Sequence, residues 1–226
     1  MSAQVLILGG SGRIGSSVAA DLFTFTSAEM VISGRNAALG KKVCDRLESR
    51  GRFLSLDLSD RKGLTQAISQ ADLVIHCAGP FHYRDTQVLE ICIQHSVNYL
   101  DVSDHPSFTR KAISCAASAE TAGVTAISNT GIFPGISNSM VRQDVEQLDE
   151  AEAIHLSYAV AGSGGAGVTV MRTTFLGLQK PFQAWIDGAW KTVKPYSDRE
   201  TIEFPNPYGR TGVYWSGQSH LIEPRV

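Results

Sequence analysis

The sequence predicts an α/β fold: a doubly wound parallel sheet followed by a second, β-rich α/β domain. Three observations support this prediction. Short apolar runs recur through the first 130 residues, a glycine-rich loop follows the first of them, and the composition changes near residue 150. Near-continuous apolar strands are typical of parallel sheets that are buried on both faces, with a helix joining each strand to the next.

The apolar runs mark the strands of the first region. Their first residues lie 20 to 26 positions apart, which leaves room in each gap for one helix and two short loops. A rival interpretation, that the runs are segments of buried helices, fits poorly because the runs are short and bounded by glycine. The six runs begin at Val5, Met30, Phe53, Leu73, Tyr99 and Val124. The intervening segments with few helix breakers are 16–25, 38–50, 87–95 and 108–122.

The second region has a different character. All three tryptophans lie beyond residue 150, and the alternation of strands and helices stops there. Asp187-Gly188 is a two-residue hairpin signal that predicts pairing of the segments on either side of it. A stretch of glycine and serine at 162–167 predicts a flexible loop. The segments that we predict as strands are 155–160, 170–178, 182–186 and 189–193.

These patterns divide the chain into two domains. We assign residues 1–130 to the doubly wound sheet and residues 131–226 to the second domain. The second domain has few apolar segments with which to close a core. We therefore expect it to be incomplete, or to require a partner.

Composition excludes several classes of function. Hydrophobic residues make up 43% of the 226 residues and charged residues 19%, and the formal net charge is −2. This balance provides no electrostatic field for nucleic acid or anionic membranes, and no apolar run reaches the roughly 18 residues of a transmembrane helix. The N-terminus does not resemble a secretory signal. Four cysteines without CxxC spacing predict reduced thiols and a cytoplasmic location.

The glycine loop is the most informative motif. Gly10, Gly12 and Gly15 match the pattern GxGxxG, directly after an apolar run and at the start of a helical stretch. In a Rossmann-type fold the first glycine permits a tight turn, the second admits a diphosphate, and the third allows the helix to pack against the strand. The alternative is a glycine-rich turn that serves chain geometry alone. The loop residues that we assign to cofactor binding are Gly9, Gly10, Ser11, Gly12, Arg13, Ile14 and Gly15.

The end of the second strand predicts which dinucleotide binds. A carboxylate at this place holds the ribose of NAD, but the sequence here is Ser33-Gly34-Arg35-Asn36. A guanidinium pairs in bidentate fashion with a phosphate, so Arg35 predicts NADP as the cofactor. The alternative is that Arg35 is a solvated surface residue.

Two further strand ends are predicted to line the cofactor. Asp57 and Leu58 end the third strand, where Asp57 is placed to contact the adenine or, alternatively, to precede a helix cap. The fourth strand ends in a turn of small residues that would let the ribose and nicotinamide approach, although a plain connecting turn has the same composition. The residues of this turn that we assign to cofactor binding are Cys77, Ala78, Gly79, Pro80 and Phe81.

The end of the fifth strand provides the candidates for acid–base chemistry. Asp101 and Asp104, together with His105, fall at the carboxyl edge of the sheet, where they could act as acid, base or anchor for a substrate amine. The alternative is that Asp104 or Ser103 caps the helix that has Pro106 in its first turn. The histidines show no ligand spacing, so no metal site is predicted. No tyrosine precedes a lysine by four residues and GxSxG is absent, which argues against short-chain dehydrogenases and hydrolases.

Taken in order, the motifs resemble those of the saccharopine dehydrogenase family, in its saccharopine reductase-like branch. The segments that carry the resemblance are GGSGRIG at 9–15, SGRN at 33–36, HCAGPF at 76–81, NYLDVSD at 98–104 and GIFPGISN at 131–138. The resemblance implies an NADP-binding Rossmann domain followed by a substrate and dimerisation domain. Chains of this family usually continue beyond the point where this one stops, which adds to the expectation of an incomplete second domain.

The predicted function follows from the resemblance. It implies an NADP-dependent oxidoreductase that transfers hydride to or from a carbon–nitrogen centre of an amino-acid-like substrate, and a homodimer. If the acceptor is a preformed iminium, orientation and electrostatics suffice without a dedicated acid. The alternative is a non-catalytic NADP-binding sensor or scaffold, which the missing tyrosine–lysine pair allows.

Overall fold

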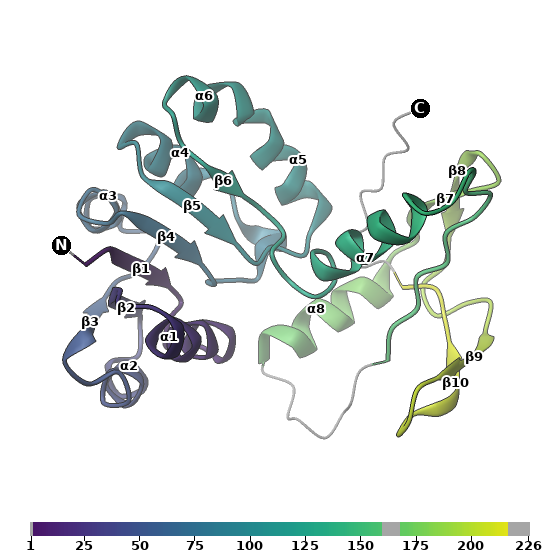
Figure 1. The fold of residues 1–226 in the computed structure, drawn as a ribbon, viewed down its shortest axis with the longest axis horizontal. Coiled ribbons are helices and arrows are strands. Elements are labelled where there is room, and N and C mark those ends of the chain that lie inside the picture. The colour runs from purple at the N-terminus through teal and green to yellow at the C-terminus, as the bar shows by residue number, and fades with distance from the viewer. Residues whose placement is uncertain (1, 160–167, 217–226) are drawn as a thin grey trace. The chain divides into compact units, whose positions relative to one another are not determined.

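A computed structural model describes residues 2–159 and 168–216 of the chain (Figure 1). The chain divides into two compact units, Met1–Pro134 and Gly135–Val226. The predicted loop at 162–167 lies outside the described residues, as does Val160 at the end of one predicted strand.

The first unit is built on a single sheet of six parallel strands. The strand order β3-β2-β1-β4-β5-β6 is that of a doubly wound fold, and it confirms the predicted fold class. The order reverses between β1 and β4, so the loops that follow these two strands leave in opposite directions. The strands are β1 (Gln4–Leu8), β2 (Glu29–Gly34), β3 (Gly51–Ser55), β4 (Leu73–His76), β5 (Asn98–Asp101) and β6 (Ala126–Ile127).

Helices cover both faces of this sheet, because side chains alternate between the faces along each strand. In β1, Leu6 and Leu8 join a core cluster with residues of α3, α4 and α5, whereas Val5 and Ile7 join a cluster with Ala19 of α1. The helices are α1 (Arg13–Phe25), α2 (Ala37–Cys44), α3 (Arg61–Ile68), α4 (Gln87–Gln94), α5 (Pro106–Ser114) and α6 (Ala116–Thr121). The two short 3₁₀ helices of this unit are η1 (Glu48–Arg50) and η2 (Phe81–Tyr83).

Two predicted helices are shorter than expected. The predicted helix 108–122 is divided at Cys115 into α5 and α6, and the predicted helix 38–50 ends at Cys44. Beyond it, the Arg50 side chain donates hydrogen bonds to the carbonyls of Phe23 and Thr26 at the end of α1 and lies 4.0 Å from the Phe23 ring. Arg50 therefore caps a helix that has no basic residue in its own last turn.

The described residues of the second unit form two helices and two antiparallel hairpins. The predicted hairpin is confirmed: Phe182–Ile186 pairs with Ala189–Val193, and both turn residues adopt positive φ, 53° at Asp187 and 73° at Gly188. The elements are α7 (Ile136–Val145), α8 (Val168–Gln179), β7 (Phe182–Ile186), β8 (Ala189–Val193), β9 (Glu200–Phe204) and β10 (Gly209–Val213).

Two predicted strands of this unit are wrong. Residues 170–178 lie in α8, because Met171, Phe175 and Leu178 follow the helical spacing of four and three residues, which outweighs the β-branched residues around them. Residues 155–159 are not in a strand, since the described part of the chain provides no neighbouring strand for them. A strand needs such a partner for its backbone hydrogen bonds.

Candidate functional site

The carboxyl edge of the parallel sheet gathers the loops that the sequence singled out. The two loops at the switch point are in contact: Cys77 N–H donates to the Leu8 carbonyl at 2.8 Å, and a Cβ on Gly9 would lie 2.9 Å from the backbone of Ala78. Gly9 has φ of +74°, a conformation that favours glycine. Ligands of open α/β sheets bind at this reversal of strand order.

The glycine loop leaves the start of α1 open. Gly12 is the N-cap, and within the described residues no side chain caps this helix and no acidic residue lies in its first turn. Gly10 packs against Ile32 of β2, and a Cβ on Gly15 would collide with the carbonyl of Gly9. A diphosphate fits this arrangement, because the first amides of a helix and its dipole attract anions where no side chain stands in the way.

The end of β2 lies beside the glycine loop. A Cβ on Gly34 would collide with the Ser11 side chain, and Arg35, the next residue, is exposed. Ser33 is buried, so its side chain cannot face a ligand. The Asn36 side chain accepts from the Leu39 amide at 3.1 Å and caps α2. Arg35 is therefore the residue of this segment whose side chain is available to a phosphate.

Asp57 lies at the end of the third strand, near two arginines. The Ser59 amide and hydroxyl both donate to Asp57 Oδ1, at 2.9 and 2.8 Å, and lower the pKa of this carboxyl. The charges of Arg35 and Arg84 lower it further. Arg84 was not predicted from the sequence. Leu58 is partly buried against the core, and its carbonyl accepts from the Gln87 side chain at 3.3 Å.

The turn after β4 presents backbone more than side chains. Phe81 is buried, with its ring 4.9 Å from that of His76 and 5.0 Å from that of Phe108, so its side chain belongs to the core and not to the cofactor site. Burial raises the pKa of the Cys77 thiol to about 12, which keeps it protonated and excludes it as a nucleophile. Ala78, Gly79 and Pro80 are half-buried and stay candidates for contact with a ligand.

His76 is a buried titratable residue that sequence reasoning missed. It is fully buried at the end of β4, and its Nδ1 lies 3.2 Å from the Tyr99 hydroxyl. Burial lowers its pKa to about 4, so the ring is neutral at neutral pH. Its Nε2 has no hydrogen-bond partner among the described residues. No spacing pattern marks this residue, because a histidine in an apolar strand resembles any other core position.

Asp101 is completely buried, and its carboxylate is surrounded by donors. Oδ1 accepts from the amides of Ser103 and Asn129, at 2.9 and 3.0 Å, and Oδ2 accepts from the Ser128 hydroxyl at 2.7 Å. The Asn129 side chain extends this network to Ser103 and Thr109. The geometry favours a role in joining the ends of β5 and β6, and the predicted catalytic role of Asp101 stays a prediction.

Asp104 and His105 follow in the same loop. Burial raises the pKa of Asp104, which is half-buried. His105, not Asp104, caps α5: its Nδ1 accepts from the Ser107 amide at 3.3 Å. That bond leaves the proton on Nε2, which then donates to His82 Nδ1 at 2.8 Å. The structure thus joins His105, the residue after Asp104, to His82 of η2.

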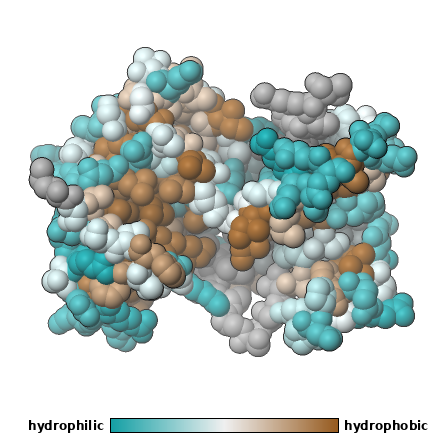
Figure 2. Space-filling view, viewed as in Figure 1, coloured by the Kyte–Doolittle hydropathy of each residue, from teal (hydrophilic) through white to brown (hydrophobic). Residues whose placement is uncertain are grey.

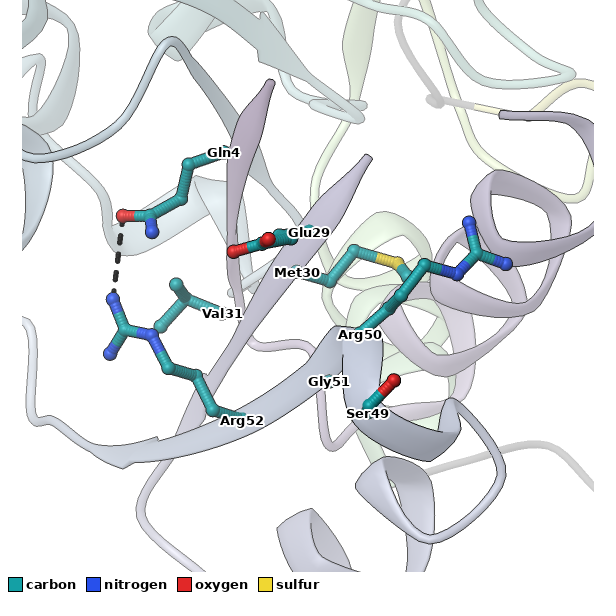
Figure 3. Close-up of a pocket in the computed structure, with 8 residues that line it drawn as sticks. All are labelled: Gln4, Glu29, Met30, Val31, Ser49, Arg50, Gly51 and Arg52. Carbon is teal, nitrogen blue, oxygen red and sulfur yellow. Dashed lines mark hydrogen bonds between the residues drawn. The ribbon is translucent and has the colours of Figure 1, made fainter. Parts of the chain in front are cut away.

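The first unit also has an exposed hydrophobic surface and a small cavity. The space-filling view shows hydrophobic surface over its middle (Figure 2), and Ile14 in the first turn of α1 is 51% exposed. A small cavity of about 50 Å³ lies at the opposite, amino edge of the sheet, where Arg52 donates to Gln4 at 3.4 Å (Figure 3). Its size excludes a dinucleotide.

Sequence comparison points to one group of proteins. The chain is 27% identical over 124 residues to a protein of Arabidopsis thaliana described as a probable mitochondrial saccharopine dehydrogenase-like oxidoreductase, a match that covers 48% of this chain and 27% of that protein. It is 27% identical over 62 residues to the human saccharopine dehydrogenase-like oxidoreductase, which covers 27% of this chain and 14% of that protein. Each match thus spans less than a third of the relative's length.

A solved structure shows the same fold. It is the apo form of saccharopine dehydrogenase (L-Glu forming) from Saccharomyces cerevisiae, with a TM-score of 0.70 at 18% identity, over 96% of this chain and 50% of that chain. Among the described residues, none of the helices is both long enough and apolar enough to cross a membrane. Residues 5–127, which contain the glycine loop and the carboxyl ends of all six strands, match the model of the saccharopine dehydrogenase NADP-binding domain. The chain therefore belongs to the saccharopine dehydrogenase NADP-binding domain family, whose cofactor is NADP.

Proposed function

We propose that this protein is an NADP-dependent oxidoreductase that transfers hydride to or from a carbon–nitrogen centre of an amino-acid-like substrate. The observation that carries this proposal is the open start of α1, capped only by Gly12, at the switch point of the sheet in a chain of this family. The relatives are named as oxidoreductases, which supports the same reaction class.

Different residues of the chain are suited to different parts of the cofactor. The amides of Arg13, Ile14 and Gly15 begin α1 and are suited to the diphosphate. Arg35 is suited to the 2′-phosphate, because its guanidinium is exposed at the end of β2. Asp57 and the half-buried turn at Ala78 lie on the neighbouring strand ends. NADP, when bound, supplies or accepts the hydride.

Proton transfer is the part of the reaction for which the geometry favours one candidate over another. The carboxylate of Asp101 is engaged by three donors, whereas Asp104 is half-buried and has a raised pKa. A raised pKa brings a carboxyl closer to the range in which it exchanges protons with an amine. We therefore propose Asp104 as the proton-exchanging group, and a supporting role for Asp101.

A titration followed by an assay tests the proposal. NADPH fluorescence measured against increasing concentrations of the 226-residue protein is expected to saturate, and Gly12→Asp is expected to abolish the signal by placing a carboxylate at the phosphate position. Oxidation of NADPH is then followed with pairs of amino acids and aldehydes or keto acids. Absence of saturable binding would refute the cofactor assignment.

The alternative function is separated by the same experiment. A non-catalytic NADP sensor or scaffold would bind NADPH tightly but oxidise it with none of the substrate pairs. Two other expectations also stay proposals: a homodimer, tested by light scattering, and a cytoplasmic location, tested by tagging the protein in its own cell. The substrate is a proposal as well, because this chain covers 27% of the Arabidopsis relative and 50% of the yeast chain.

A further inference from the structure

The side chain of Arg84 is anchored at the same edge of the sheet as the predicted cofactor residues. Arg84 follows η2 and is half-buried, and its Nε–H donates to the Ala78 carbonyl at 2.9 Å. Ala78 in turn packs against Gly9 of the glycine loop. The bond uses one of the five N–H donors of the guanidinium. The Nε end of the guanidinium is thus held by the turn that borders the predicted cofactor site.

The charges near Arg84 converge from three strand ends. Arg35 follows β2, Asp57 follows β3 and Arg84 follows β4, and each of the two other charges acts on Arg84. Asp57 Oδ1 already accepts from the amide and the hydroxyl of Ser59. Among residues 2–159 and 168–216, none of the ion pairs within 4 Å involves Arg35 or Arg84. Both guanidiniums therefore remain without a direct carboxylate partner.

This arrangement has a consequence for an anionic ligand. A phosphate monoester carries about −1.5 to −2 charges at neutral pH. Asp57 is exposed and ionised, and its charge repels such a group, so that the single charge of Arg35 only offsets it. Asp85, which also acts on Arg84, is exposed and accepts from the Gln87 amide at 3.2 Å. The two arginines and the two carboxylates therefore balance in charge, and the attraction for a phosphate must come from the N–H groups that the guanidiniums donate to it. Arg84 provides the second guanidinium.

We propose that Arg84 is a second specificity-determining residue for the cofactor, and that its guanidinium binds the 2′-phosphate of NADP together with that of Arg35. This inference rests on the proposed function, because it assumes that the dinucleotide occupies the carboxyl edge. The bond to Ala78 holds the guanidinium in place before the ligand arrives, so little side-chain entropy is lost on binding.

The test compares two fragments that differ only in the 2′-phosphate. Calorimetric dissociation constants of adenosine 2′,5′-bisphosphate and adenosine 5′-phosphate are measured on the wild-type chain and on Arg84→Gln. Glutamine is neutral but keeps an N–H donor for the Ala78 carbonyl. The preference for the bisphosphate is expected to fall by about tenfold to a hundredfold in Arg84→Gln, the factor that hydrogen bonds to a charged group contribute. Arg84→Lys, which keeps the charge, is expected to retain part of it.

Matched variants separate the possible outcomes. Arg35→Gln is expected to lower the preference as Arg84→Gln does, whereas Arg52→Gln, at the amino edge of the sheet (Figure 3), is expected to leave it unchanged. If Arg84→Gln weakens both fragments equally, Arg84 only supports the turn and the inference is wrong, while the proposed function stands. If the wild-type chain binds neither NADPH nor either fragment, the proposed function itself fails.

Discussion

Substitution of Asp101 separates a supporting role from a catalytic one. In Asp101→Asn the side-chain oxygen can occupy the place of Oδ1 and accept from the amides of Ser103 and Asn129. The new amide group then faces Ser128, whose hydroxyl can reverse its role and accept. The two amides and the Ser128 hydroxyl keep a partner in this variant, whereas the negative charge is lost.

The size of the effect follows from these bonds. Asp101→Ala leaves three donors without their acceptor, each of which costs about 1–3 kcal/mol when buried. Two of these donors are only partly buried, so we expect a loss of about 3–5 kcal/mol in the free energy of unfolding. Asp101→Asn exchanges charge-assisted bonds for neutral ones and is expected to cost about 1 kcal/mol.

Denaturant unfolding and NADPH titration together provide the assay. Asp101→Asn is expected to fold, to bind NADPH with the affinity of the wild-type protein and, with any substrate that is turned over, to keep most of its activity. A variant that is folded and binds NADPH normally but has lost turnover would show that Asp101 carries a proton in the reaction. A loss of stability in Asp101→Asn as large as in Asp101→Ala would refute the hydrogen-bond argument.

Three further predictions follow from the first unit. Gly9→Ala is expected to lower the free energy of unfolding by about 2–4 kcal/mol, because φ is +74° and the new Cβ would meet the Ala78 backbone at 2.9 Å. The control is Gly123→Ala, where φ is +67° and the new Cβ would meet no atom within 4 Å, and it is expected to cost about 1–2 kcal/mol. Arg50→Ala is expected to cost about 1–2 kcal/mol by denaturant unfolding, and a cost below that of Arg50→Lys would contradict its capping role. The pKa of His76 is about 4 in the folded protein and near 6.5 in the unfolded chain. Its contribution to the free energy of unfolding is therefore fully present above pH 6.5 and is lost as the pH falls towards 4. Over that window the wild-type protein is expected to lose about 3 kcal/mol more than His76→Gln, and parallel stability–pH curves for the two proteins would contradict this assignment.

The first unit could be predicted from the sequence because its signals are local. Each apolar run marks its own strand, the run before the glycine loop marks the first turn, and Arg35 lies within a residue of the strand end that it follows. The hairpin at Asp187-Gly188 was predicted from a local signal too, namely its two turn residues. The helix α8 was not predicted because its β-branched residues favour a strand locally, whereas the helical spacing of its apolar residues extends over the whole segment.

The parts of the site that could not be predicted depend on contacts between distant residues. The donors to Asp101 include Ser128 and Asn129, which lie 27 and 28 positions further along the chain. A carboxylate at a strand end reads as a catalytic candidate until such partners are known. Arg84 belongs to no motif, and only the fold places it near Asp57 and Arg35.

The same backbone atoms that complete the fold at the switch point also shape the proposed cofactor site. The Cys77 amide bonds to the Leu8 carbonyl, and Gly9 leaves no room for a side chain between the two loops. A substitution in either loop therefore changes folding and binding together. The residues that can alter the choice of dinucleotide without disturbing the sheet are the cations around it, since Arg35 is exposed and Arg84 joins the turn through a single side-chain bond. Specificity is thus expected to vary through these side chains, while the amide turn that holds the diphosphate stays constant.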